Sequence, residues 1–203
     1  DDGPITYNSH FTFGGDTTTA STSSFSDAYG LSKADSLFGG DGVNEPDTYV
    51  YRYDPTTDAD NLNTAGVLLG KDLTGAPVYG SGIAGGAAGL YRVYLAWPTT
   101  SNVNTAGVNF EAVSGSNTYT VHVDQNEPTI QKQANDDRMP WVYLGDINYD
   151  GSSGIILYQR AAVNSFVSMR AAAALFEPVP EPTSLALLGA GVGCLGWIWR
   201  RRR

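Results

Sequence analysis

The last 26 residues, 178–203, constrain the chain most, because they set where a folded body has to end. They open on the prolines of Pro178-Val179-Pro180-Glu181-Pro182. Proline has no backbone donor and disfavours helix in the residue before it. An uncharged apolar run, 185–199, comes next, and four arginines close the chain. We therefore expect the folded body to stop near Pro178.

The apolar run predicts a short transmembrane helix. Its 15 residues would span roughly 22 Å as a helix, against a hydrocarbon core of ~30 Å. Tryptophans favour the membrane interface and arginines the cytoplasmic side. A buried core helix is the alternative for so short a run, and the terminal arginine block argues against it. The expected anchor residues are Leu185, Leu188, Leu195, Trp197, Trp199, Arg200, Arg201, Arg202 and Arg203.

This tail resembles the PEP-CTERM sorting signal of Gram-negative bacteria. The box Val179, Pro180, Glu181 and Pro182, the Gly-rich apolar helix and the basic end occur in that order. The resemblance implies export, transient anchoring in the inner membrane, recognition by an exosortase and removal of the tail near the box. It also implies a final place at the cell surface or in the extracellular matrix, among exopolysaccharide. No signal peptide is visible, so we expect the numbering to begin after its removal.

Charge and cysteine content exclude several kinds of function. The tail carries four arginines and one glutamate, a net charge of +3. The whole chain has a net charge of −9, so the rest of the chain carries −12. A body this acidic argues against nucleic acid as a partner, because that binding depends on cationic groups that neutralise phosphates. The single cysteine, Cys194, lies in the apolar run. The body therefore has no internal disulfide, cysteine-based zinc site or thiol nucleophile.

The body itself reads as an all-β domain. Charged residues make up only 16% of the chain and glycine is abundant at 24. Alternation of apolar and polar residues predicts strands most clearly at 48–53, 90–98, 118–124 and 141–149. Further strands are expected at 5–13, 64–69, 108–113, 155–159 and 166–176. We also expect a short helical turn within 27–38 and a connector at 75–89. Residues 17–26 are either an edge strand or a loop.

Eight or nine short strands separated by turn residues predict a β-sandwich or jelly roll. We expect this domain to occupy residues 1–177. A Pro-Glu-Pro linker follows at 178–184, and a transmembrane helix with an arginine-rich cytoplasmic end at 185–203.

The body also resembles the golvesin C-terminal-like domain. The residues that carry the resemblance are 91–98, 119–125, 141–145 and 154–157, with 51–53 as an early strand. The stretch Met169-Arg170-Ala171-Ala172 departs from the Asp-Ala pair that is usual in the family. The resemblance implies a jelly roll of the galactose-binding-like class, and an accessory or adhesive module without catalysis of its own.

Several aromatic and histidine residues have two readings. Tyr49, Tyr51 and Tyr53 share one strand face, which favours core packing, with a sugar-stacking platform as the alternative. Trp97 and Trp141 have the same two interpretations, and the pattern favours an inward-facing position with core packing. His122 lies on a polar strand face, where we expect a cross-strand hydrogen bond rather than catalysis.

Calcium is the only cofactor that the sequence suggests, as a structural ion. Asp146, Asn148 and Asp150 match the first half of a calcium loop, but the twelfth position is Leu157. The alternative, which Asp150-Gly151 favours, is a hairpin turn. A second candidate site is the loop with Asp41, Glu45 and Asp47.

No nucleophile elbow, zinc-binding His pair or phosphate loop is present, so we assign no catalytic residues. The expected function is that of an exported, non-enzymatic surface or matrix protein that binds polysaccharide or acts as an adhesin. Its ligand-binding residues are not identifiable from the sequence. The alternatives are a structural subunit of a surface layer or filament, and a small carbohydrate-active enzyme whose paired acids are brought together only by folding.

Overall fold

The computed structural model describes residues 8–15, 18–26, 34–39, 46–58, 64–99, 101–130 and 140–180, and for 18–26, 34 and 35 the backbone. Within these ranges the protein is all-β, with 13 strands and no helix. The prediction of an all-β body is confirmed. No helix in the described part of the chain is long and apolar enough to cross a membrane. The apolar run 185–199 lies outside that part.

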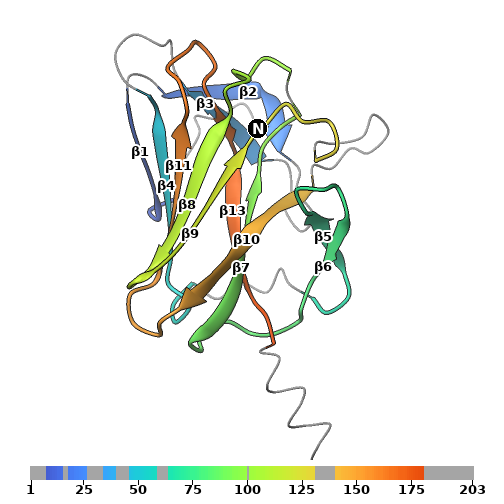
Figure 1. Cartoon of the computed structure of the whole chain (residues 1–203), viewed down its shortest axis with the longest axis vertical. Coiled ribbons are helices and arrows are strands. Elements are labelled where there is room, and N and C mark those ends of the chain that lie inside the picture. The colour runs from blue at the N-terminus through green and yellow to red at the C-terminus, as the bar shows by residue number, and fades with distance from the viewer. Residues whose placement is uncertain are drawn as a thin grey trace, which may run out of the picture.

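The first sheet has five antiparallel strands in the order β1-β4-β11-β8-β9. It occupies the left side of Figure 1. β11 lies at its centre and pairs with both β4 and β8. The bounds are β1 Phe11–Gly14, β4 Thr48–Tyr53, β11 Ile155–Ala161, β8 Val108–Ser114 and β9 Asn117–Val123.

The second sheet also has five strands, in the order β13-β7-β10-β5-β6. Its pairs are antiparallel except for β10 and β5, which run parallel. The bounds are β13 Ala173–Pro178, β7 Gly89–Ala96, β10 Trp141–Tyr149, β5 Leu68–Lys71 and β6 Pro77–Tyr79. A small third sheet near one end of the molecule, at the top of Figure 1, contains β12 Arg170–Ala171, β3 Ala34–Gly39 and β2 Thr18–Ser26.

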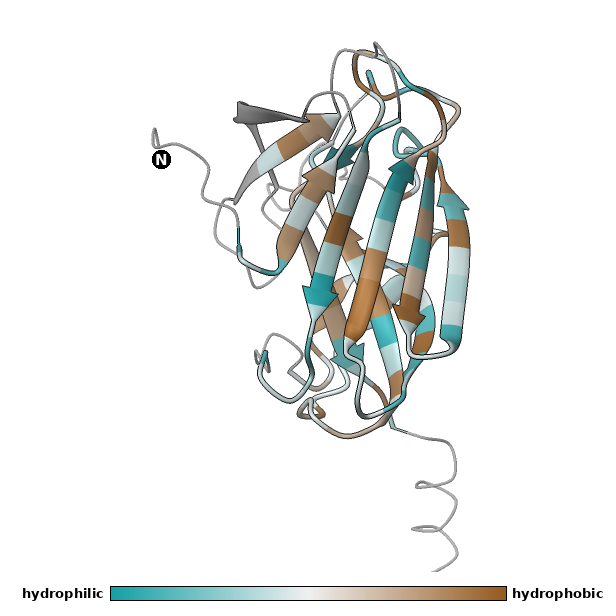
Figure 2. Ribbon diagram, turned by 90° about the vertical axis from the view of Figure 1, so that its left-hand side faces the viewer, coloured by the Kyte–Doolittle hydropathy of each residue, from teal (hydrophilic) through white to brown (hydrophobic). Residues whose placement is uncertain are grey.

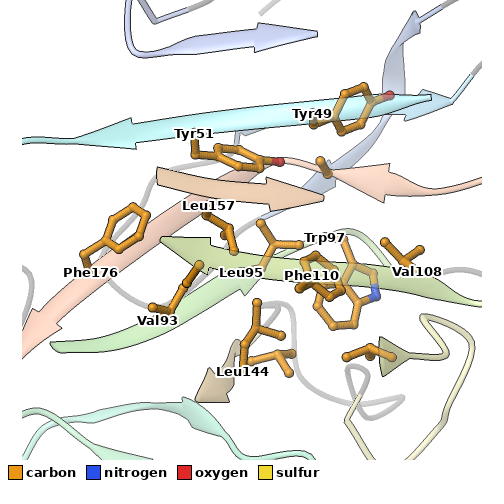
Figure 3. Close-up of a cluster of buried hydrophobic side chains, with 14 of the residues drawn as sticks. Tyr49, Tyr51, Val93, Leu95, Trp97, Val108, Phe110, Leu144, Leu157 and Phe176 are labelled. Atoms are coloured by element: carbon orange, nitrogen blue, oxygen red, sulfur yellow. The ribbon is translucent and has the colours of Figure 1, made fainter. Parts of the chain in front are cut away.

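The two larger sheets pack around a shared hydrophobic core. Apolar and polar residues alternate along several strands, as the brown and teal bands of Figure 2 show. Because successive side chains of a strand point to opposite faces, the apolar ones share the face toward the core. The first sheet contributes Tyr49, Phe110 and Leu157, and the second contributes Val93 and Leu144 (Figure 3). Burying one such side chain contributes about 1.5–3 kcal/mol. Neither sheet closes on itself, so the architecture is an open two-sheet sandwich, and its assignment to the jelly rolls stays a prediction.

The tyrosines of β4 and Trp97 pack in the core as the sequence predicted, whereas Trp141 is buried but not in that core. Tyr49 and Tyr51 are buried in the core, and Tyr53 packs against it. Trp97 and Trp141 are each 1% exposed. They belong to different clusters, because Trp97 lies in the main core whereas Trp141 lies in a second cluster with Leu69, Tyr94, Ala96 and Leu175. That cluster occupies the opposite, outer face of the second sheet.

A bulge in β10 brings the two sheets together. The register of β10 on β7 shifts between Tyr143 and Gly145. The Tyr119 hydroxyl donates a 2.9 Å hydrogen bond to the Leu144 carbonyl. A Cβ on Gly145 would lie 2.2 Å from atoms of the Tyr119 ring. A side chain at position 145 would therefore have to displace the Tyr119 ring, which rests on the backbone of β10.

Buried glutamines hold the short strand β12. Gln125 accepts a hydrogen bond from the Arg170 amide and donates one to the Arg170 carbonyl, at 2.8 and 2.7 Å. Gln159 donates to the same carbonyl at 2.9 Å, and accepts from the Tyr51 hydroxyl at 3.1 Å. These bonds satisfy the backbone of Arg170 deep inside the fold, where water cannot reach.

Some local predictions are wrong. Within the segment 27–38, where a short helical turn is expected, residues 34–38 belong to β3, and 27–33 lie outside the described residues, so the turn stays a prediction. The expected strand at 64–69 begins only at Leu68, and the connector 75–89 contains β6. The expected strand 166–176 is interrupted, because Phe166 lies in a turn with 69% exposure. The short pieces were missed because strands of three or four residues show too little alternation.

Candidate functional site on the outer face of the second sheet

A row of charged residues crosses the outer face of the second sheet. Arg92 on β7 lies directly opposite Asp146 on β10 and opposite Glu177 on β13. Directly opposed residues have Cβ atoms about 4.5–5.5 Å apart, so the central guanidinium has a carboxylate on each side. Arg92 Nη1 lies 3.6 Å from Glu177 Oε2.

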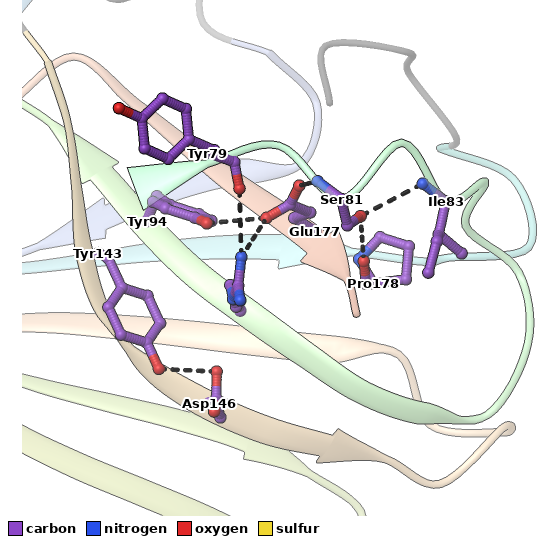
Figure 4. Close-up of polar contacts among 9 residues, drawn as sticks. Tyr79, Ser81, Ile83, Tyr94, Tyr143, Asp146, Glu177 and Pro178 are labelled. Carbon is purple, nitrogen blue, oxygen red and sulfur yellow. Dashed lines mark hydrogen bonds and ion pairs between the residues drawn. The ribbon is translucent and has the colours of Figure 1, made fainter. Parts of the chain in front are cut away.

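Two tyrosines in the adjacent row turn their hydroxyls toward these acids. Tyr94 and Tyr143 are opposite each other, with ring centroids 5.6 Å apart. Tyr94 donates a 2.8 Å hydrogen bond to Glu177 Oε2, and Tyr143 donates a 2.8 Å bond to Asp146 Oδ1 (Figure 4). The β10 bulge makes the second bond possible, because it puts positions 143 and 146 on one face.

The two acids differ in their access to solvent. Glu177 is fully buried, and its other oxygen accepts the Ser81 backbone amide. Asp146 and Tyr143 are half-buried, and the Arg92 side chain is 33% exposed. Arg92 also donates to the carbonyl of Tyr79, at 3.3 Å, and the Tyr79 side chain is 52% exposed. We call Tyr79, Arg92, Tyr143 and Asp146 the outer patch.

The surroundings of this face raise the pKa values of Tyr94, Tyr143 and Arg92. Burial, together with the hydrogen bond to Glu177, raises the pKa of Tyr94 well above its usual value. Burial and Asp146 raise the pKa of Tyr143 in the same way. Burial opposes the charge on Arg92, but Tyr94, Glu177 and Asp146 outweigh it and raise the pKa of Arg92. The outer patch therefore places the guanidinium of Arg92 and the protonated phenol of Tyr143 beside the side chain of Asp146.

The first candidate calcium loop is divided between different roles. Asp146 belongs to the outer patch, and Asn148 is exposed, with its carbonyl accepting from Asn117 Nδ2 at 2.9 Å. Asp150 accepts the amides of Ser152 and Ser153 at 2.8 and 2.9 Å. These bonds lower the pKa of Asp150 to about 2. The chain turns at Asp150-Gly151, with Gly151 at a φ of 87°, but the predicted hairpin is wrong, because the flanking strands β10 and β11 belong to different sheets.

The second candidate calcium loop is described only at its end. Asp41 and Glu45 lie outside the described residues. Asp47 is fully buried, and its Oδ2 accepts from Ser168 Oγ at 2.5 Å. No group of three or more acidic, histidine or cysteine residues that could hold a metal ion occurs among the residues the structure describes. A structural calcium ion stays a prediction.

The histidines lie apart from the outer patch. His122 is opposite Asn109, and the two side chains share a 2.8 Å hydrogen bond. The predicted cross-strand role of His122 is confirmed. His10 is exposed, with Nδ1 3.5 Å from Asp58.

Sequence reasoning missed every residue of the outer patch except Asp146. One signal was available. The strongly apolar strand β7 carries a charge, Arg92, on the face opposite to its core residues. The residues that meet on this face come from distant parts of the chain. Tyr94 and Glu177, which share a hydrogen bond, are 83 positions apart.

A scan against family models finds the PEP-CTERM protein-sorting motif at residues 178–203. Searches of curated proteins and of solved structures gave no match. The golvesin-like resemblance of the body therefore stays a prediction. Of the sorting residues, Val179 and Pro180 are described, whereas Glu181, Pro182 and the anchor residues lie outside the described part. The chain carries the sorting motif of exported proteins that exosortases process at the membrane of Gram-negative bacteria.

Proposed function

We propose that this exported protein binds polysaccharide at the outer patch and has no enzymatic activity. The observation that carries the proposal is the half-exposed group of Arg92, Tyr143 and Asp146. A guanidinium and a carboxylate can each form paired hydrogen bonds with neighbouring hydroxyl groups of a sugar. The exposed ring of Tyr79 adds an apolar surface with a polar end, as is frequent at recognition sites.

The arrangement of the acids favours binding over hydrolysis. Glycosidases use two carboxyl groups that flank the bond to be cleaved. Here the second acid of the row, Glu177, is fully buried beneath Ser81. A substrate can therefore reach Asp146 but not its counterpart. The face is suited to holding a sugar chain through hydrogen bonds at one carboxylate.

The test is polysaccharide binding by the exported protein purified from an exosortase-bearing host. We expect Tyr79→Ala and Asp146→Asn each to weaken binding about tenfold, which corresponds to about 1.4 kcal/mol. Tyr158→Ala is the matched control, because Tyr158 is a half-buried tyrosine on the outer face of the first sheet. Unchanged binding by both patch variants would contradict the proposal. Turnover of any polysaccharide would contradict the absence of catalysis.

A structural subunit of a surface layer or filament is the second candidate. The observation that favours it is the position of β9 at the edge of the first sheet. Such edges can pair with a strand from another molecule. Thr118, Thr120 and His122 of β9 are exposed. Ordered assemblies of a protein that binds no acidic or neutral polysaccharide would favour this function.

A further inference from the structure

The sorting motif begins inside the folded body. The motif covers residues 178–203, whereas β13 continues through Pro178. Beyond the strand, the Val179 amide still donates to the Leu90 carbonyl at 3.0 Å. Pro180 is the first exposed residue. The motif's first two residues are thus held in the second sheet, with no spacer between the body and the motif.

Ser81 fastens the end of β13 from the side. Its amide donates to Glu177 Oε1, and its hydroxyl donates to the Pro178 carbonyl at 2.6 Å (Figure 4). Tyr94 and Arg92 hold the other oxygen of Glu177. We call Ser81, Arg92, Tyr94 and Glu177 the end clamp. It anchors a carboxylate that has no access to water, so freeing β13 would break all of these contacts at once.

We propose that the end clamp sets the upstream limit of tail removal. The exosortase then cuts no peptide bond before the one that follows Val179, and the mature protein keeps the whole of β13. A peptide bond has to leave a paired strand before an enzyme can enclose it. The end clamp opposes this for every bond before Val179. The proposal rests on the sorting motif and is independent of polysaccharide binding.

The length of chain beyond the clamp sets the downstream limit. The apolar run begins at Leu185. The five intervening residues, 180–184, can extend at most about 18 Å. The cut therefore falls between Val179 and the membrane, close to the end of the body.

In the cleavage the C–N bond breaks, the acyl group passes to water or an acceptor amine, and the tail leaves with the proton on its new amine.

The experiment is to express the full chain in an exosortase-bearing Gram-negative host and to sequence the C-terminus of the exported product by mass spectrometry. Trypsin cuts after Arg170, and no lysine or arginine follows before Arg200. One tryptic peptide from Ala171 therefore reports the end. We expect it to stop at Val179 or at one of residues 180–184. A product that ends before Val179, or that retains the tail, would overturn the proposal.

Two variants test the clamp itself. In Glu177→Ala we expect additional products that end before Val179, because β13 is released. Glu111→Ala is the matched control: it removes a glutamate whose partner, Arg160, lies in the first sheet, and we expect the wild-type end. Additional ends in the control as well would show that general loosening, not the clamp, sets the limit. If Glu177→Ala does not accumulate, Ser81→Ala removes the hydroxyl bond to the Pro178 carbonyl, and an unchanged C-terminus in that variant would contradict the role of the clamp.

Discussion

The hydroxyl of Tyr94 donates a 2.8 Å hydrogen bond to Glu177, a carboxylate with no exposed surface. This contact belongs to the end clamp, and Glu177 also lies 3.6 Å from Arg92 of the outer patch. The strand that precedes the sorting tail and the face proposed to bind polysaccharide are therefore held by the same buried group.

Tyr94→Phe tests that hydrogen bond. The substitution keeps the ring but leaves a buried carboxylate with one donor fewer. We expect the free energy of unfolding to fall by about 1–3 kcal/mol, measured by urea denaturation. Tyr158→Phe is the control, because Tyr158 is half-buried on the other sheet, and a change within about 0.5 kcal/mol is expected there. Equal effects of the two substitutions would show that the Glu177 bond has no special role.

Gly145→Ala tests the contact between the sheets. The added methyl group would lie 2.2 Å from the Tyr119 ring, at a φ of 155°. We expect a loss of about 1–3 kcal/mol in the free energy of unfolding, measured by the same denaturation. In a Tyr119→Ala background the added cost of Gly145→Ala should be smaller, because the ring is gone. An undiminished cost would assign the loss to backbone strain alone.

Acid should weaken the turn at Asp150. The pKa of this carboxyl is lowered to about 2 from 3.8 by the amides of Ser152 and Ser153. The folded protein therefore favours the charged form, so its contribution to stability is complete above pH 4 and is lost as the pH falls toward 2. We expect Asp150→Asn to show a smaller fall in melting temperature over this interval. Ser152→Ala keeps the amide donor and should behave like the wild type, and identical profiles for all three proteins would contradict the assignment.

Metal removal tests the calcium interpretation. Asp146 accepts from Tyr143, Asp150 from the turn serines, and Asp47 from Ser168. Because Asp146 and Asp150 already have protein donors, we expect Asp146→Asn and Asp150→Asn to leave any effect of EDTA on the melting temperature unchanged. A drop with EDTA that added calcium reverses, and that Glu45→Gln abolishes, would instead place an ion at the loop of Asp41 to Asp47.

The strands that could be predicted are those whose alternation is long. β7 has a long alternating pattern, so the inward position of Trp97 just beyond its end followed from spacing, whereas Trp141 at the start of β10 lies on the outer face. The outer patch could not be found in this way. Arg92 and Asp146 occupy outward positions, but their pairing depends on the register of β10, which the bulge at Gly145 shifts. A bulge of one residue leaves no periodic signal.

By itself, the sequence determined the sorting tail and the all-β class, because both depend on neighbouring residues: the order of prolines, apolar run and arginines, and the period of two along each strand. Tertiary structure decided how the end of β13 is held and which side chains meet on the outer face. Ser81 and Glu177 are 96 positions apart, and many registers would satisfy the same local pattern. Only the packing of both sheets on one core selects the register that closes the clamp.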